Sequence, residues 1–179
     1  PDILVCRTEH SLNDDIKRKV ALFCNVTKDA VIEALDADTI YGVPLEMMRE
    51  KLDKICLTKL QLPISKEPEM VKWKEFLNKL RYPKSKITVG LIGKYVELQD
   101  AYKSILEALI HAGAVNECKV VIKNIHSEFL TPENAVEKLQ DVDAILVAPG
   151  FGSRGIEGKI NAIQYAREQK VPFFGICLG

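Results

Sequence analysis

The sequence predicts an α/β fold built from two parallel, doubly wound parts, both incomplete. Two observations support this prediction. From residue 87 onward, short apolar runs typical of buried strands alternate with stretches of helical period. Near the start of the chain, a strand pattern is followed directly by a helix pattern. Alternating β and α units of this kind imply parallel strands joined by crossing helices.

The chain opens with a predicted buried strand over residues 2–7, which form an apolar run. The next stretch, residues 12–26, has helical period, and Asn13 or Asp14 is suited to the start of the helix. Four apolar side chains of this helix are expected to point inward: Ile16, Val20, Leu22 and Phe23.

An Asp-rich turn marks residues 30–44, which predict short strands around it. Residues 44–60 predict a helix. Pro44 falls in its first turn, where the missing N–H does no harm.

Proline and lysine then interrupt the pattern on both sides of a lone amphipathic helix, which is predicted over residues 71–81. We place a domain boundary at about residue 83. It separates a first part, residues 1–82, from a second part, residues 83–179.

The second part alternates regularly between strands and helices. We expect Gly113 to end its first helix, and Thr131, followed by Pro132, to cap the next one. The predicted strands cover residues 87–93, 118–125, 144–150 and 171–176, the last of them buried, and the predicted helices cover residues 100–113, 131–140 and 158–169.

Ligands of doubly wound sheets lie at the carboxyl ends of the strands, which draws attention to the loops 93–104, 148–159 and 175–179. The last of them reads Gly-Ile-Cys-Leu-Gly, a G-x-C-x-G pattern. Its glycines permit the sharp strand-to-helix turn that exposes a nucleophile, and a helix after the turn favours the thiolate. Cys177 is therefore a candidate nucleophile; the alternative is a small buried cysteine between two turn glycines.

A glycine-rich loop, residues 149–155, follows an apolar strand and lets backbone N–H groups approach a ligand closely. The Lys-Ser/Thr ending of a G-x-x-x-x-G-K-[ST] nucleotide loop is missing. If Gly150 and Cys177 lie on adjacent strand ends, the loop supplies an oxyanion donor beside the thiolate, as acyl transfer requires. A plain glycine turn is the alternative.

Lys94, Tyr95 and Lys103 lie around the first strand end of the second part and suit an anionic, ring-bearing ligand, because a helix N-terminus adds positive field there. A solvated helix start is the alternative. The consecutive cations at residues 17–19 are typical of a solvated helix face. We interpret the three histidines as structural or exposed, since none has an acid at dyad spacing: His10, His111 and His126.

Composition excludes several classes of protein. The chain of 179 residues has 25 basic and 25 acidic residues, which gives no reason to expect a nucleic-acid or membrane partner. Its five cysteines are odd in number, widely spaced and free of C-x-x-C pairs, which indicates reduced thiols, no metal site and a cytoplasmic protein. No apolar run approaches transmembrane length. The start without Met and the abrupt end suggest an internal fragment.

Several stretches together resemble the CTP synthase family. They are LIGKYVELQDAYKSILEAL, VAPGFGSRGIEGKI and GICLG, in this order, preceded by PDILVCR and VALFCNV. The resemblance implies that residues 1–82 are the C-terminal portion of a P-loop-type amidoligase (synthetase) domain, with a linker helix. Residues 83–179 would then be the start of a flavodoxin-like class I glutamine amidotransferase domain.

The resemblance implies a ligase of pyrimidine biosynthesis. Ammonia released from glutamine would pass through a tunnel and aminate UTP to CTP at the expense of ATP, with Mg²⁺ as cofactor, GTP as allosteric activator and a homotetramer as the assembly. Cys177 would be the nucleophile, Gly150 the oxyanion donor, and Phe151 and Leu178 would line the glutamine pocket. Other contacts are implied for GTP at Lys94, Tyr95, Lys103 and Arg154, for the UTP or CTP phosphates at Lys19, and for the ATP adenine at Leu35, Asp36 and Ala37.

One departure from the family pattern lies at Ala148-Pro149-Gly150, where the family has two glycines before Phe and so places a glycine at the position of Pro149. Proline lacks the backbone N–H that a glycine would supply at this position. The difference matters only if the N–H at position 149 donates to the oxyanion. By the resemblance, the catalytic His and Glu lie beyond residue 179, and the phosphate loop and Mg²⁺ carboxylates lie before residue 1. We therefore expect the 179 residues alone to be inactive.

Two other functions remain open. Hydrolases of the related G-x-C-x-G superfamily typically carry a His directly after the Cys, and Leu178 stands there. An inactive fragment that acts only as an interaction module is the other alternative.

Overall fold

The computed structural model of the chain describes residues 1–64, 66–98 and 100–178. It contains two compact units, Pro1–Met70 and Val71–Gly179. The predicted helix over residues 71–81 forms, and it packs on a helix of the second unit. The family's domain boundary near residue 83 stays a prediction.

The first unit contains a two-stranded parallel sheet with Leu4 opposite Val31 and Thr8 opposite Leu35. The strand-then-helix order expected from the sequence is confirmed. In chain order the elements, with short 3₁₀ helices labelled η, are β1 (Leu4–Thr8), α1 (Asp14–Cys24), η1 (Lys28–Ala30), β2 (Val31–Leu35), η2 (Ile40–Gly42), α2 (Val43–Arg49) and α3 (Leu52–Lys59).

Helix α1 begins as predicted and packs differently. The Asn13 side chain caps it by accepting a hydrogen bond from the Ile16 N–H at 2.9 Å. The inward orientation of its apolar residues is wrong, because Leu22 and Phe23 are 80% and 87% exposed and Ile16 is also exposed. The helix contacts η1 and β2, and Ala21 is its buried residue. The large apolar side chains lie outside this small contact.

Two predicted elements of the first unit have different bounds. Residues 30–44 form one strand, β2, and the second strand expected there is replaced by η2, where the Thr39 hydroxyl accepts a hydrogen bond from the Tyr41 N–H at 3.4 Å. The helix expected over residues 44–60 is divided into α2 and α3, because Lys51 between them is left-handed, with φ of 59°. Pro44 lies in the first turn of α2, as predicted.

A partly buried ion pair joins α1 to β2 in the first unit. Lys17 Nζ lies 2.6 Å from Glu33 Oε1 and 3.7 Å from Glu50 Oε2. The hydrogen bond from Lys17 lowers the pKa of Glu33 against the opposing effect of burial, and the same bond raises the pKa of Lys17. The pair is therefore charged on both sides at neutral pH.

We expect Glu33→Gln to flatten the acid limb of the stability profile. A carboxylate with a lowered folded-state pKa stabilises the fold above its unfolded-state pKa of about 4.3, and this contribution is lost as the pH falls through the folded-state value. Urea titrations at several pH values should show unfolding free energy falling more steeply in acid for the wild type than for the variant. Glu9→Gln, at an exposed position of the same unit, should follow the wild type. Equal slopes for Glu33→Gln and wild type would contradict this account.

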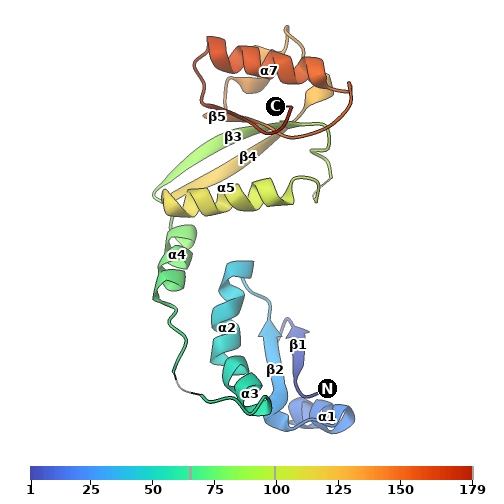
Figure 1. Cartoon of the computed structure of the whole chain (residues 1–179), viewed down its shortest axis with the longest axis vertical. Helices are drawn as coiled ribbons and strands as arrows, with labels where there is room; N and C mark the ends of the chain where they lie inside the picture. Colours follow the sequence, from blue (N-terminus) through green and yellow to red (C-terminus); the bar gives the residue numbers. More distant parts are fainter. Residues whose placement is uncertain (65, 99, 179) are drawn as a thin grey trace. The chain divides into compact units, whose positions relative to one another are not determined.

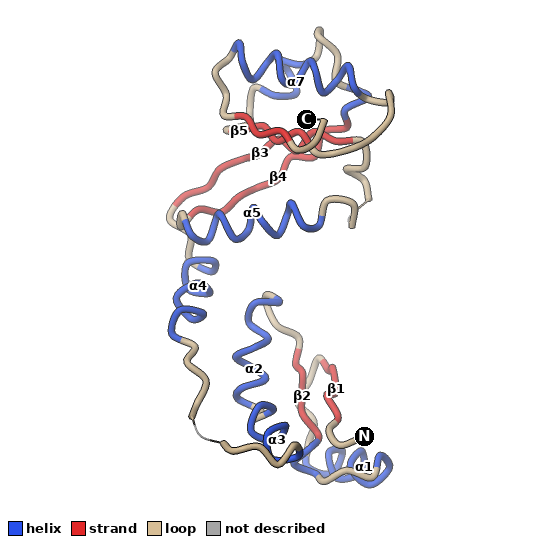
Figure 2. Tube along the Cα trace, in the orientation of Figure 1, coloured by secondary structure: helices blue, strands red, loops and turns tan. Residues whose placement is uncertain are grey.

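The described strands of the second unit form a four-stranded parallel sheet in the order β4-β3-β5-β6 (Figures 1 and 2). This is the flavodoxin-like order, and the doubly wound prediction is confirmed. The elements are α4 (Val71–Arg81), β3 (Ser85–Gly93), α5 (Lys103–Val115), β4 (Cys118–His126), η3 (Ser127–Phe129), α6 (Ala135–Leu139), β5 (Ala144–Val147), α7 (Ile156–Glu168) and β6 (Phe173–Gly175).

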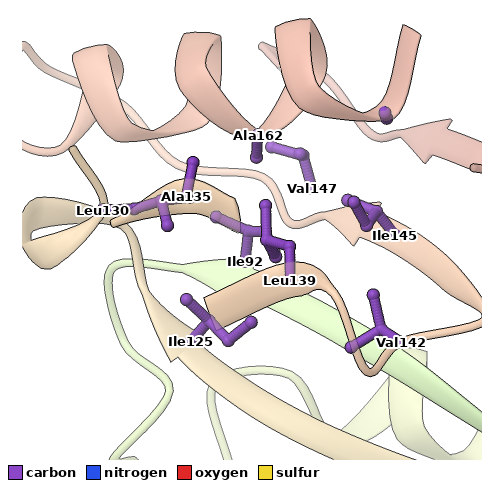
Figure 3. Close-up of a cluster of buried hydrophobic side chains, with 10 residues drawn as sticks. Ile92, Ile125, Leu130, Ala135, Leu139, Val142, Ile145, Val147 and Ala162 are labelled. Atoms are coloured by element: carbon purple, nitrogen blue, oxygen red, sulfur yellow. The ribbon is translucent and has the colours of Figure 1, made fainter. Parts of the chain in front are cut away.

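Helices cover both faces of this sheet. Figure 1 shows α5 on one face and α7 on the other. On the α7 side, Ala162 packs with Ile92 and Val147 of the strands, and α6 adds Leu139 to the same core (Figure 3). The core on the α5 side includes Tyr102 and the partly buried apolar face of α5. The carboxyl ends of β3 and β5 therefore lie between two packed cores.

Three predictions for the second unit need correction. Helix α5 passes through Gly113 and ends at Val115; a Cβ at Gly113 would lie 2.6 Å from the Cys118 carbonyl oxygen, so the glycine permits close packing on β4. The helix expected over residues 131–140 is shorter, with Asn134 preceding α6, so Thr131 is not its N-cap. Strand β6 is not buried.

Strand β6 is exposed because it pairs with β5 alone among the described strands. Its two aromatic residues, Phe173 and Phe174, are both exposed. No helix in the described part of the chain is long and apolar enough to cross a membrane.

Candidate active site

The strand order reverses between β3 and β5. From β3 the chain crosses through α5 to β4, and from β5 it crosses through α7 to β6 on the other side. Loops that leave such a pair in opposite directions open a crevice at the carboxyl ends of the strands. The loops expected to hold a site follow β3, β5 and β6, so they meet at this edge of the sheet.

Cys177 lies on the turn after β6 and is exposed. Its φ is 63°, in the left-handed region that non-glycine residues rarely adopt. The Ile176 N–H donates to the Val147 carbonyl at 3.1 Å and ties this turn to β5. A strained residue on a sharp turn after a parallel strand is the geometry of a nucleophile elbow. Gly179, the last residue of the G-x-C-x-G pattern, lies outside the described residues.

Glycines shape the loop after β5. The Ala148 N–H still donates to the Ile92 carbonyl at 2.8 Å, so the loop leaves from a fixed point. Gly152 and Gly155 have φ of 78° and 74°, which favour glycine, and Gly155 precedes the first turn of α7. The loop therefore adopts a backbone path that other residues would strain.

Two buried lysines hold the carbonyl oxygens of this loop. Lys94 is 4% exposed, and its Nζ donates to the carbonyls of Phe151 and Gly152, the latter at 2.9 Å. Lys159 is 2% exposed, and its Nζ donates to the Ala148 carbonyl at 2.8 Å. The sequence predicts Lys94 on an open rim, whereas its ammonium is enclosed by the loop.

Lys159 is a residue that the sequence analysis misses. It shares one helical stripe with Ala162 and Ala166, both buried, at the i, i+3 and i+7 positions of α7. The position of this lysine on an otherwise apolar helical stripe was the sequence signal that could have indicated a buried ammonium.

The electrostatics of the two loops are coupled through Lys159. Burial lowers the pKa of Lys159, the neighbouring Lys94 ammonium lowers it further, and Cys177 raises it. Cys177 is therefore within electrostatic reach of the ammonium that holds the glycine loop. This coupling supports the expectation that Gly150 and Cys177 lie on adjacent strand ends.

Tyr102 fixes the loop after β3. Its hydroxyl oxygen accepts hydrogen bonds from the backbone N–H groups of Lys94 at 3.1 Å and Tyr95 at 3.3 Å. A Cβ at Gly93 would lie 2.6 Å from the same oxygen, so this position requires glycine. Tyr102, which is buried, is a second residue of the candidate site that the sequence motifs do not reveal.

The residues expected to contact GTP are partly brought together. The Arg154 guanidinium lies 5.4 Å from the centre of the Tyr95 ring, and its Nη1 lies 2.8 Å from Glu128 Oε1. Lys103 is exposed and pairs with Glu107 at 3.0 Å on the surface of α5. Lys103 also lines a hollow of about 300 Å³ at the end of β3, together with Leu91, Val96, Leu98, Asp100, Tyr102, Leu106 and Asn124.

The residues expected to bind glutamine lie on the loops after β5 and β6. Phe151 is 89% exposed, and Leu178 is also exposed. Gly150 is half-buried; a Cβ there would lie 3.7 Å from Lys94 Cε and 3.8 Å from Lys159 Nζ. Their contacts with glutamine stay predictions.

In the first unit, the candidate nucleotide contacts are all exposed. Lys19 lies on the solvent side of α1. Leu35, Asp36 and Ala37 line a hollow of about 480 Å³ at the end of β2, where Arg7 Nε lies 3.4 Å from Asp36 Oδ1. A parallel strand end with an open hollow is suited to a ligand.

Two of the histidines pack against aromatic rings, which fits their interpretation as structural residues. His111 packs edge-to-face on Phe76, and His126 stacks on Phe129 and accepts a hydrogen bond from the Glu128 N–H at 3.3 Å. All five cysteines are free thiols. Within the described residues, no group of three or more His, Cys, Asp or Glu could hold a metal ion.

A flavodoxin-like sheet, a strained cysteine at a strand end and a glycine loop beside it are consistent with a class I glutamine amidotransferase. Residues 97–179 match the family model described as Glutamine amidotransferase class-I, and residues 1–62 match that of the CTP synthase N-terminus. The chain belongs to the CTP synthase family, which confirms the resemblance drawn from its motifs.

Relatives match nearly the whole chain. It is 60% identical over 178 residues to a CTP synthase of Flavobacterium psychrophilum and 60% identical over 179 residues to one of Cytophaga hutchinsonii, covering 99% and 100% of this chain. It spans about a third, 33%, of each of these relatives. A solved structure described as the Trypanosoma brucei CTPS glutaminase domain with bound acivicin has 34% identity and a TM-score of 0.49, covering 52% of this chain and 37% of that one.

Proposed function

We propose that this chain belongs to an enzyme that aminates UTP to CTP with ATP, using ammonia released from L-glutamine. Residues 83–179 would contribute the glutaminase nucleophile and residues 1–82 part of the synthetase. The observation that carries the proposal is Cys177, left-handed after β6 and electrostatically coupled to the lysine that holds the glycine loop. The enzyme would be a cytoplasmic homotetramer of pyrimidine biosynthesis.

In the proposed glutaminase step, Cys177 Sγ attacks the side-chain amide carbon of glutamine. The carbonyl oxygen becomes an oxyanion that accepts a hydrogen bond from the Gly150 N–H. The C–N bond then breaks, and the departing nitrogen takes the proton that a general base removed from the thiol, so that ammonia leaves. Water hydrolyses the thioester to glutamate and restores the thiol.

In the proposed synthetase step, ATP phosphorylates the C4 oxygen of UTP and ammonia displaces the phosphate. Lys19 would meet the pyrimidine nucleotide's phosphates, and Leu35, Asp36 and Ala37 would lie beside the ATP adenine. Mg²⁺ would neutralise the phosphates of ATP when bound. Among the described residues, no group of three or more His, Cys, Asp or Glu could hold the ion.

GTP is proposed as the activator of the glutaminase at the rim around β3. The Arg154 guanidinium already lies over the Tyr95 ring there, and Lys103 offers an exposed ammonium on the helix that follows. Lys94, whose ammonium is buried, would respond to GTP through the loop carbonyls that it holds.

The proposal is tested by incubating a complete CTP synthase that carries this chain with UTP, ATP and either glutamine or ammonia. Chromatography of the nucleotides should show CTP with both nitrogen donors. The G-x-C-x-G hydrolase alternative would be favoured if the enzyme formed no CTP from either nitrogen donor but hydrolysed another amide or peptide substrate. No turnover of any substrate would favour an interaction module.

We expect Lys103→Ala to reduce GTP activation of glutamine-dependent synthesis by at least about fivefold, because it removes a charge-assisted contact with the effector. Synthesis from ammonia should stay near the wild-type rate. Lys19→Ala, in the synthetase part, should behave conversely and weaken UTP use with either donor. Equal losses with both donors in Lys103→Ala would contradict its role.

A further inference from the structure

The glycine loop is anchored on both sides of Gly150. Lys159 holds the carbonyl that precedes it, at Ala148, and Lys94 holds two carbonyls that follow it. The two ammonium groups reach the loop from different elements, α7 and the end of β3. Only the peptide units around Gly150 lie between the anchored positions.

Two buried cations close to one glycine are costly to maintain. Burial and the field of Lys94 lower the pKa of Lys159, which means that the folded protein disfavours its charged form. The surrounding stripe of α7 is filled by alanine, and an apolar side chain could complete it without this cost. Packing alone therefore does not account for the two buried ammonium groups.

Fixed carbonyls constrain the N–H groups of the loop. A peptide unit is planar, so anchoring the units on either side leaves few orientations for those in between. Oxyanion stabilisation is strongest when the donor already points at the position where charge develops and need not reorganise during the reaction. The two lysines meet this requirement from opposite ends of the loop.

We propose that Lys159, together with Lys94, positions the Gly150 N–H to receive the oxyanion formed when Cys177 attacks glutamine. The inference rests on the glutaminase function proposed above. Lys159 acts through the loop backbone, so it is a positioning residue.

The test uses Lys159→Met in a complete CTP synthase that carries this chain. Methionine keeps much of the side-chain volume and removes the donor. The kcat for glutamine hydrolysis should fall about 10²-fold, the loss typical of one oxyanion donor, with the KM for glutamine changed by less than about twofold. CTP formation from ammonia should be unchanged. Arg167→Met, an exposed position on the same helix, should leave all three quantities at wild-type values.

Alkylation of Cys177 by iodoacetamide separates positioning from an effect on the thiol. The alkylation reaction forms no oxyanion. The alkylation rate of Cys177 in Lys159→Met should therefore differ from that in the wild type by less than about threefold, while the rate of glutamine hydrolysis falls about 10²-fold. Peptide mapping after brief treatment gives the rate for Cys177. Parallel losses of alkylation and hydrolysis would overturn the proposal, as would an unchanged kcat.

Lys94→Met provides an independent test from the other side of the loop and decides the question if Lys159→Met does not fold. The same loss of kcat with little change in alkylation is expected. Wild-type hydrolysis rates in this variant would overturn the proposal. Failure of the wild-type enzyme itself to hydrolyse glutamine would instead refute the proposed function. The two proposals therefore fail by different results.

Discussion

Replacing Cys177 with alanine is expected to reduce glutamine-dependent CTP formation by on the order of 10⁴-fold or more, because the proposed thioester forms on the Cys177 thiol. CTP formation from free ammonia should keep its wild-type rate, since it bypasses the glutaminase. The two rates are measured in parallel on a complete CTP synthase that carries this chain.

Cys118→Ala is the matched control for this experiment. Cys118 is a free thiol at the start of β4, in the same unit, at the opposite end of the sheet from the active-site loops. Its replacement should leave both rates unchanged. Glutamine-dependent synthesis that survived in Cys177→Ala would remove Cys177 from the reaction and leave its left-handed turn as a structural feature alone.

The largest expected loss of stability follows Gly158→Ala. Alanine is normally the better residue inside a helix by about 1 kcal/mol. At this position a Cβ would lie 1.7 Å from the Ser127 carbonyl oxygen, so α7 must move away from η3. We expect the free energy of unfolding to fall by about 3 kcal/mol, with the opposite sign to the helix preference.

Urea titration measures this loss, and Gly90→Ala provides the comparison. A Cβ at Gly90 would lie 3.4 Å from the nearest atom, a methyl carbon of Val142, which is ordinary contact. That variant should stay within about 1 kcal/mol of the wild type. Equal effects of the two substitutions would show that α7 does not pack as closely on Ser127 as the structure indicates.

Local patterns in the sequence were sufficient for most of the fold. Asn13 caps α1 as expected, and the alternation after residue 87 produces the doubly wound sheet. The errors concern features that depend on what lies opposite a segment. Phe23 and Phe174 are apolar residues that no described element covers. The break between α2 and α3 depends on the left-handed backbone of Lys51, which a lysine at this position does not predict.

The candidate site was predictable where chemistry depends on a short motif. Cys177 and Gly150 could be proposed as site residues from spacing and strand ends, and their roles stay predictions. Lys159 and Tyr102 could not, because their roles come from hydrogen bonds to loops elsewhere in the chain. The charge of Lys94 predicts a contact with an anionic ligand. In the structure its ammonium instead donates a hydrogen bond to the Gly152 carbonyl, a tertiary contact that the sequence does not reveal.

The position of β6 has a consequence for biosynthesis. Among the described strands of the second unit, it comes last in the chain and pairs with β5 alone. Segments leave the ribosome in chain order, so the turn that carries Cys177 is made after the remaining described strands of the second unit. A partly made sheet therefore lacks the turn that positions Cys177, and the loop after β5 and both lysines that hold it are made before that turn.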